Sequence, residues 1–501
     1  MSSRTSAPAA APASSDGIDR RVWIISGVAM LGAVMSILDT TIVNVALDSL
    51  GRDFHAALSE IQWVVTGYML SLAAVIPVSG WAARRMGAKR VFVASLILFT
   101  IGSVLCGLAT SSTEIILFRV LQGLGGGMIM PLAQLIMAQE AGPKRMGRVM
   151  SLVAVPMMLA PILGPTLGGV LIQTLGWRWI FFVNLPVCIV AVALAVRILP
   201  DSSGSKTDRL DVLGLGLMSS GLVGITYGLA EIGTLGTFSS AKVYAPIAAG
   251  ILLVAGFAVH ATRAKNPLLD LNLYRRWSFT AASIAMFALG AAVFGAMILM
   301  PLYWQQVRHE SVINTGLLTA PQGLGMALVM PLAGKLTERW GGGPIALAGV
   351  LMTTLTTIPF GLIGAHTSVA SLSVWMVLRG VGLGFSFMPA MTAAFATLER
   401  HELSHATPQL NVLNRVGGSI GTAILAVVLQ RALTGAHTAS ASASAYGTAF
   451  WWSAGLTALA IVPCVILTRA EHNTRRQAKA TDTKNPDEAL LESGAIAEAL
   501  A

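Results

Sequence analysis

The chain alternates between long apolar runs and short polar or charged turns from residue 22 to residue 468. A helix needs about 20 residues to cross a hydrocarbon core roughly 30 Å thick, and most runs reach that length. In lipid, a long apolar segment satisfies its backbone amides only as a helix. The pattern therefore predicts an all-α polytopic membrane protein. Its fourteen expected spans lie near residues 22–47, 61–80, 91–110, 115–139, 149–174, 179–197, 212–231, 243–261, 279–304, 313–335, 343–364, 370–397, 406–430 and 448–468.

The composition excludes a soluble globular domain, because 54% of the residues are hydrophobic and 11% are charged, with a mean hydropathy of +0.72. The three cysteines, Cys106, Cys188 and Cys464, all fall inside the expected spans. Neither a disulfide framework nor a cysteine metal cage is therefore expected.

The net charge of +10 is distributed unevenly along the chain. If the N-terminus is cytoplasmic, the tails and cytoplasmic loops hold 25 of the 33 Lys and Arg residues, the external loops 5 and the spans 3. This asymmetry follows the positive-inside rule. It predicts a cell-membrane protein with both termini in the cytoplasm. The basic turns are expected to face anionic lipid headgroups and not nucleic acid.

A repeat divides the chain. The segment "AAVIPVSGWAARRMG" (73–87) aligns with "ALVMPLAGKLTERWG" (327–341) at an offset of 254 residues, and "FRVLQGLGGGMIMP" (118–131) is echoed by "LRGVGLGFSFMP" (378–389). Such repeats are typical of transporters with a site near the bilayer midplane. The expected organisation is a disordered cytoplasmic leader (1–21), an N-terminal six-helix half (22–198), a linker with two spans (199–276), a C-terminal six-helix half (277–469) and a charged cytoplasmic tail (470–501).

Six segments carry a resemblance to a known family: "LDTTIVNVAL" (38–47), "GWAARRMGAKR" (80–90), "FRVLQGLGGG" (118–127), "APILGPTLGG" (160–169), "WRWIFFVNLP" (177–186) and "LDVLG" (210–214). Together they resemble the major facilitator superfamily and, within it, the fourteen-span drug:proton antiporter family. The resemblance implies two six-helix halves with two additional helices between them. It also implies bacterial multidrug efflux by proton-coupled alternating access, in a monomer without a cofactor.

Two of these motifs imply moving parts. The turn between spans two and three and its second copy imply conformational gating by Gly80, Arg84, Arg85, Gly87, Arg90, Glu338 and Arg339. Arg84 stands where the family motif usually has an acid, which puts a lock built on that acid in doubt.

The antiporter motif of span five comprises Ala160, Gly164, Pro165, Gly168 and Gly169, with Ala160 in place of the usual glycine. Its small residues leave one helix face almost bare, so another helix can approach closely. We expect this face to be a moving contact between the two halves; tight packing without a mechanistic role is the alternative.

Among the 23 acidic residues only Asp39 lies deep in an apolar run. It lies about 27 Å along the helix from Arg21, while Arg119 lies roughly 7 Å in from the opposite end of its span. Charges at membrane depth normally face a partner or a water-filled cavity. The hypothesis is that Asp39, beside Arg119, takes and releases the driving proton. The alternatives are a purely structural partner for Asp39 and snorkelling of Arg119 to the lipid headgroups.

Further polar and polarisable residues are candidates for a substrate cavity: Ser36, Thr40, Asn44, Gln122, Met157, Met300, Arg379 and Arg415. The two arginines either line the cavity or hold helices together through backbone carbonyls. The methionines either form an adaptable apolar pocket or fill the core.

A lone cavity carboxylate favours lipophilic cations as substrates, such as drugs or toxic metabolites. A carrier of one specific metabolite or self-made antibiotic would use the same scaffold, and the sequence leaves the presence of an accessory export protein open. A rival from another class is a membrane metalloprotease, because "HELSH" (401–405) satisfies the H-E-x-x-H zinc motif. It lies in a short loop with no further embedded ligand, so no metal site is expected.

Overall fold

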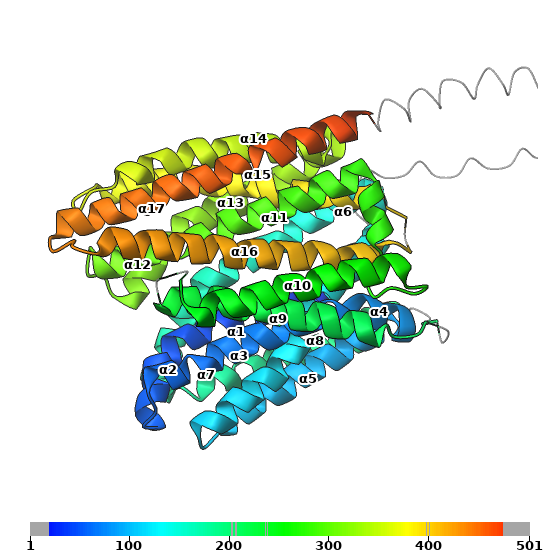
Figure 1. The fold of residues 1–501 in the computed structure, drawn as a ribbon, viewed down its shortest axis with the longest axis horizontal. Helices are drawn as coiled ribbons and strands as arrows, with labels where there is room; N and C mark the ends of the chain where they lie inside the picture. The colour runs from blue at the N-terminus through cyan, green and yellow to red at the C-terminus, as the bar shows by residue number, and fades with distance from the viewer. Residues whose placement is uncertain are drawn as a thin grey trace, which may run out of the picture.

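The computed structural model describes residues 20–201, 204–205, 208–235, 237, 239–396, 398–399 and 401–473, and within them every regular element is a helix (Figure 1). Most of the predicted leader and tail lie outside these residues. The elements are α1 (Arg20–Asp53), α2 (Leu58–Ile61), α3 (Trp63–Val75), α4 (Val78–Met86), α5 (Ala88–Leu108), α6 (Ser112–Leu175), α7 (Trp179–Phe182), α8 (Asn184–Ile198), α9 (Val212–Leu235), α10 (Ala241–Arg263), η1 (Leu271–Arg275), α11 (Trp277–Met297), α12 (Leu299–Gln306), α13 (Val312–Trp340), α14 (Gly342–Thr357), η2 (Ile358–Leu362), α15 (Val369–Ala396), α16 (Leu403–Leu433) and α17 (Ala439–Leu459).

The helices form two bundles with a further pair between them. Elements α1 to α8 build the N-terminal half and α11 to α17 the C-terminal half, and α1 packs along α6 as α11 packs along α16. The pair α9 and α10 lies between the halves (Figure 1), where α9 contacts both α3 and α16. Ser219 donates to the Ala74 carbonyl at 2.6 Å, and Tyr227 stacks on Trp63 with ring centroids 5.9 Å apart. These contacts fix the additional pair against the N-terminal half.

The long helices run between two ends of the bundle. We call the end that holds Arg20 proximal and the end that holds Asp53 distal; the short helices α2, α7 and α12 lie at the distal end (Figure 1). At the proximal end, Gly87 and Gly341 turn the chain with φ of 91° and 102°. These are the last residues of the two repeat copies, and both adopt a backbone conformation that favours glycine.

The described helices bear on the expected number of spans. Twelve are long and apolar enough to cross a membrane, and the bent pair of α3 and α4, which meet at 55°, brings the number to thirteen. Helix α6 is interrupted at Gly142, with φ 67° and ψ 170°, and beyond it Thr166–Leu175 is a shorter apolar helix. The all-helical two-half fold is confirmed, and the exact count of fourteen stays a prediction.

The two halves meet at the proximal end. Arg148 donates to the Glu338 carboxylate at 2.6 Å, and Asn411 donates to the Gln134 side chain at 2.7 Å. Helix α4 approaches α16 so closely that a Cβ atom on Gly80 would lie 2.1 Å from the Ser404 carbonyl oxygen. These contacts close the bundle at this end.

Candidate functional site

The embedded carboxylate of Asp39 lies inside the N-terminal half and has no exposed surface. Its Oδ2 accepts from Arg119 at 2.6 Å, while its Oδ1 accepts from Gln122 and from Asn184, each at 2.9 Å. A buried charge is tolerated where it is paired and hydrogen-bonded, and three donors meet that requirement here. The helices α1, α6 and α8 are therefore joined through one carboxylate.

The guanidinium of Arg119 is equally buried and is held on several sides. Besides Asp39 it donates to Gln122 Oε1 at 2.8 Å and, through Nε, to the Val64 carbonyl at 3.1 Å. Its carbon lies 4.1 Å from the centre of the Tyr68 ring, within the range of a cation–π contact. Arg119 thus bonds inward to the network and does not reach toward lipid headgroups.

The depth argument placed Asp39 and Arg119 at similar levels, and the structure brings them together. It differs in one respect: both side chains are fully buried, so the pair does not share a water-filled cavity in this structure. Polar atoms of the neighbouring helices take the place that water was expected to fill. The pair is an occluded ion pair.

Sequence reasoning did not single out Asn184, Ser103 or Tyr68. Asn184 also donates to Ser103 at 2.9 Å, Ser103 donates to the Phe181 carbonyl at 2.9 Å, and the Tyr68 hydroxyl lies 3.3 Å from Ser36 Oγ. One sequence feature could have identified Asn184 as a site residue: it is a polar amide at the start of an apolar span, within the "WRWIFFVNLP" segment. The network is larger than the predicted pair.

The two arginines embedded in the spans of the C-terminal half have different surroundings. Arg379 is 2% exposed and donates to Gln322 Oε1 at 2.9 Å and to the Thr357 hydroxyl at 3.2 Å. Arg415 is half-buried, and its guanidinium makes no hydrogen bond or ion pair to any residue that the structure describes. Within the described part of the chain, neither arginine donates to a backbone carbonyl.

The other candidate cavity residues fall into distinct environments. Gln122 has no exposed surface and belongs to the Asp39 network, whereas Thr40 is half-buried and Asn44 is exposed. Met300 is 3% exposed and packs in an apolar cluster with Tyr303 and Trp304, so in this structure it fills the core. The side chain of Met157 lies outside what the structure describes.

The small-residue face of the fifth span packs within its own half. A Cβ on Gly164 would lie 2.1 Å from Thr41 Oγ1, and one on Gly168 would lie 2.9 Å from Ile42 Cγ1, so both glycines meet α1. Ala160 is buried, Gly169 has open space where a Cβ would stand, and the side chain of Pro165 is not described. Gly164 and Gly168 therefore contact α1, close to Asp39, and a moving contact between the two halves through this face stays a prediction.

The gating motif obtains its acid from elsewhere in the chain. Arg84 Nε donates to Asp208 Oδ2 at 2.9 Å, Trp81 donates to the Asp208 carbonyl at 3.3 Å, and Lys89 pairs with Asp201 at 3.0 Å. Asp201 and Asp208 belong to the linker after α8, which lies against the turn around Gly87. A linker residue therefore provides the carboxylate that the motif lacks at position 84.

The remaining gating residues divide between the interface of the halves and the surface. Gly80 and Glu338 lie at the proximal contact between the halves. Arg85 is half-buried, while Arg90 and Arg339 are exposed. The ends of the two repeat copies thus contribute to the closed proximal end, but not every motif side chain touches the opposite half.

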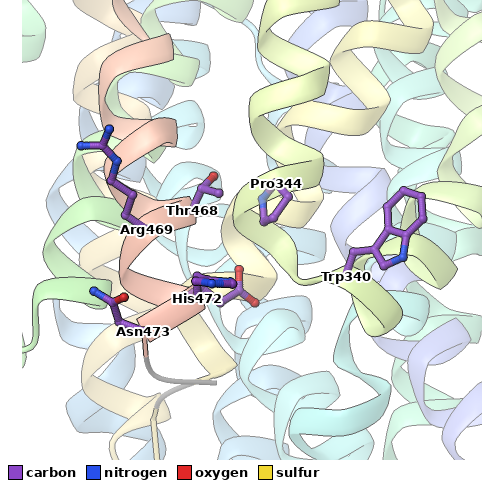
Figure 2. Close-up of a pocket in the computed structure, with 7 residues that line it drawn as sticks. Trp340, Pro344, Thr468, Arg469, His472 and Asn473 are labelled. Carbon is purple, nitrogen blue, oxygen red and sulfur yellow. The ribbon is translucent and has the colours of Figure 1, made fainter. Parts of the chain in front are cut away.

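The second repeat turn is bound by the end of the chain that the structure describes. Glu471 accepts from the Gly342 and Gly343 amides at 3.1 and 2.7 Å, at the start of α14. Beside it lies a pocket of about 320 Å³ whose lining includes Thr468, Pro344 and Trp340, while the Arg469 side chain points away from Pro344 (Figure 2). A carboxylate at a helix N-terminus is stabilised by the unpaired amides there, so this contact anchors the last helical segment.

The "HELSH" segment does not form the zinc-protease motif. Helix α16 begins at Leu403, so His401 precedes the helix and pairs with Glu399 at 3.3 Å. Glu402 bonds Arg276 through both carboxylate oxygens, at 2.7 and 2.8 Å. Among the described residues no group of three or more metal-ligating side chains occurs. Glu402 is therefore committed to an ion pair and not to a metal-bound water.

The pKa of Glu402, which lies outside the spans, is changed by its surroundings. Partial burial opposes the charged form, but hydrogen bonds from the Glu399 amide and from Arg276 outweigh it. The pKa of Glu402 therefore lies below its ordinary value.

Comparison with known proteins extends these observations over most of the chain. Residues 29–422 match the family model described as Major Facilitator Superfamily. The chain is 40% identical over 417 residues to the Multidrug resistance protein B homolog of Mycobacterium tuberculosis, covering 83% of this chain and 77% of that protein. It is 29% identical to the Tetracenomycin C resistance and export protein of Streptomyces glaucescens, covering 82% and 77%.

Solved structures show the same fold at low sequence identity. The human organic anion transporter MFSD10 (TETRAN) superposes with a TM-score of 0.61 at 16% identity, covering 89% of this chain and 99% of that one. The proton:xylose symporter XylE superposes with a TM-score of 0.60 at 14% identity, covering 87% and 94%. With the two-half bundle, the repeat and the buried charge network, these similarities establish that the chain belongs to the major facilitator superfamily and is a transporter, not an enzyme.

Proposed function

We propose that this transporter exports drugs or antibiotics across a bacterial cell membrane in exchange for protons. The relatives named for multidrug resistance and for tetracenomycin C export support the export of drugs. The basic residues concentrated in the tails and proximal turns support a cytoplasmic proximal end with both termini inside.

The observation that carries proton coupling is the occluded network around Asp39. The carboxylate is fully buried, and its donors come from two other helices of the N-terminal half: Arg119 and Gln122 from α6, and Asn184 from α8. Protonation would remove its charge, so the bond to Arg119 would lose most of its strength in this low-dielectric site. Proton binding at Asp39 would then free α1 relative to α6.

The packing of the fifth span links that event to movement. Gly164 and Gly168 allow the second leg of α6 to lie directly on Thr41 and Ile42, which follow Asp39 by less than one turn. A change in the position of α1 would therefore be transmitted to α6. Helix α6 also carries Arg148, which pairs with Glu338 of the opposite half at 2.6 Å. In this proposal, the network controls the proximal gate through α6.

Asp39→Asn tests the coupling in proteoliposomes that contain the purified protein. We expect pH-gradient-driven drug accumulation to be lost, while exchange of labelled for unlabelled drug without a gradient persists, because Asn stays neutral and keeps the shape of the side chain. The matched control is Asp48→Asn, since Asp48 is exposed on the same helix and pairs with Arg52. Full gradient-driven accumulation by Asp39→Asn would refute the assignment.

A narrower function is the export of one antibiotic, which the similarity to the tetracenomycin C exporter favours. A resistance and efflux panel in a host without its own pumps, with an uncoupler control, distinguishes the two. Resistance to several unrelated drugs supports a multidrug exporter, and resistance to a single compound supports the narrower function.

A further inference from the structure

The embedded charges of the transporter do not balance. Away from the helix ends lie one carboxylate, Asp39, and three guanidinium groups, Arg119, Arg379 and Arg415. Asp39 is fully bonded to its neighbours and pairs with Arg119. Two positive charges in the C-terminal half therefore remain without a carboxylate in the described part of the chain.

The acids of that half are all placed elsewhere. The described carboxylates between α11 and the end of the chain are at helix ends and turns, namely Glu310, Glu338, Glu399, Glu402 and Glu471. Three of them have partners named above: Arg148 for Glu338, Arg276 for Glu402 and the α14 amides for Glu471. None neutralises Arg379 or Arg415. A cation held at membrane depth without a counter-charge is costly, and such residues usually mark a pathway for a charged substrate.

Arg415 is the better placed of the two for a ligand. It lies about 18 Å along α16 from Leu403, near the middle of the bundle. Its side chain is half-buried, and Asn411, one helical turn before it, bonds Gln134 of the opposite half at 2.7 Å. Arg415 is also close enough to Tyr68 of that half for an electrostatic interaction. Arg415 therefore lies where the two halves face one another, and its donors have no hydrogen-bond partner among the described residues.

Tyr68 connects this position with the proton network. One face of its ring lies against the Arg119 guanidinium, at 4.1 Å, and its hydroxyl lies 3.3 Å from Ser36 Oγ. A negative group beside Arg415 would also be close to the residues that respond to protonation of Asp39.

We propose that Arg415 binds an anionic group of the substrate, with Arg379 adding positive potential from deeper in the C-terminal half. The substrate class would be amphiphilic acids, in which a carboxylate or phenolate accompanies an aromatic or apolar body. This inference rests on the proposed export function and names its substrates. It differs from the expectation of lipophilic cations, which was based on a lone carboxylate in the cavity, because Asp39 is already bonded to Arg119, Gln122 and Asn184.

Two xanthene dyes of similar shape and opposite charge test the proposal on the purified protein in detergent. Fluorescein carries carboxylate and phenolate groups, and rhodamine 123 is a cation. We expect fluorescence anisotropy to show that fluorescein binds at least about tenfold more tightly than rhodamine 123. Equal affinity, or tighter binding of the cation, would overturn the proposal without any variant being needed.

Arg415→Gln tests whether the tighter binding of fluorescein depends on Arg415. Loss of a charge-assisted contact predicts that fluorescein binds about ten- to a hundredfold more weakly, while Arg415→Lys keeps part of the affinity. The control is Arg431→Gln, at the exposed distal end of the same helix, which we expect to bind like the original protein. Unchanged fluorescein binding by folded Arg415→Gln would refute the site.

These experiments distinguish failure of the anion site at Arg415 from failure of the proposed proton-coupled export. Binding of fluorescein through Arg415 without proton-driven movement of any drug in proteoliposomes would leave this site standing and reject proton-coupled export. Proton-driven movement of rhodamine 123 together with weak fluorescein binding would support export and reject the anion site.

Discussion

The two halves of the transporter each bury an arginine on their fourth span, and the partners of these arginines differ. Arg119 in the N-terminal half donates to a carboxylate, whereas Arg379 in the C-terminal half donates to the neutral side chains of Gln322 and Thr357. The halves thus share a cation and differ in its counter-charge. In the proposed function, this difference places the proton site in the N-terminal half and leaves the C-terminal half positive.

The scaffold around these arginines is alike in both halves. Gly164 and Gly168 of α6 pack against α1, and Gly417 and Gly421 of α16 pack against α11. In both pairs the glycines are four residues apart, so they lie on one helix face. The repeat therefore preserves how helices approach each other, while the charged chemistry differs between the halves.

Leucine substitution of each arginine should give the largest contrast. Arg119→Leu leaves the buried Asp39 charge unpaired, and we expect it to lower stability by about 3–5 kcal/mol. Arg379→Leu leaves only neutral acceptors without a donor and removes an uncompensated charge. We therefore expect the free energy of unfolding to fall by less than about 2 kcal/mol. Thermal unfolding of the purified proteins in detergent, followed by circular dichroism, compares the two.

The double variant Asp39→Asn with Arg119→Leu is the control for that contrast. Because it removes both charges, it should recover part of the stability that Arg119→Leu loses. Equal destabilisation by Arg119→Leu and Arg379→Leu, without recovery in the double variant, would show that the two halves do not differ in charge pairing.

Part of this site could be predicted from the sequence. A carboxylate and an arginine embedded in apolar spans stand out because their burial is costly, and helical rise places Asp39 and Arg119 at comparable depths. Two consequences of tertiary packing could not be obtained in this way. Asn184 is a neutral amide without a conspicuous cost, and Asp208 lies 124 residues from the Arg84 that it pairs with.

The small-residue face illustrates another limit. Its composition predicted close helix packing, which the structure shows, but a bare face is compatible with any neighbouring helix. The neighbour is α1, and only the tertiary arrangement decides this. Likewise the two embedded arginines of the C-terminal half were visible in the sequence, whereas the lack of a partner for Arg415 among the described residues depends on side-chain positions.

Alanine substitution of the glycines at these helix contacts should lower stability by an intermediate amount, and the loss should differ between the two halves. A Cβ on Gly421 would lie 2.0 Å from the Ala291 carbonyl oxygen, a backbone atom that cannot rotate away. On Gly164 it would meet the Thr41 side chain, whose hydroxyl can turn. We expect Gly421→Ala to cost about 2–3 kcal/mol and Gly164→Ala about 1–2 kcal/mol in thermal unfolding.

Gly169→Ala is the matched control, because nothing lies within 4 Å of where its Cβ would stand. Alanine is favoured over glycine in a helix, so stability should stay the same or rise by up to about 1 kcal/mol. A loss at Gly169 as large as that at Gly421 would indicate that helix flexibility, and not close approach, requires these glycines.

The smallest expected effect concerns the Arg276–Glu402 pair, which joins the starts of α11 and α16 in the C-terminal half. The pKa of Glu402 is lowered in the folded protein, so its charge stabilises the fold above the ordinary value of 4.5. That contribution is lost as the pH falls through the lowered pKa. Because Arg276 is 40% exposed, solvent screening limits this contribution to less than about 1 kcal/mol.

Glu402→Gln should therefore unfold at a lower temperature than the original protein near pH 7, and the difference should shrink as the pH falls below about 4.5. Glu399→Gln, whose side chain is 71% exposed, should show no such pH-dependent difference. A gap between Glu402→Gln and the original protein that stays constant down to about pH 3.5 would mean that shape, and not charge, holds α11 to α16.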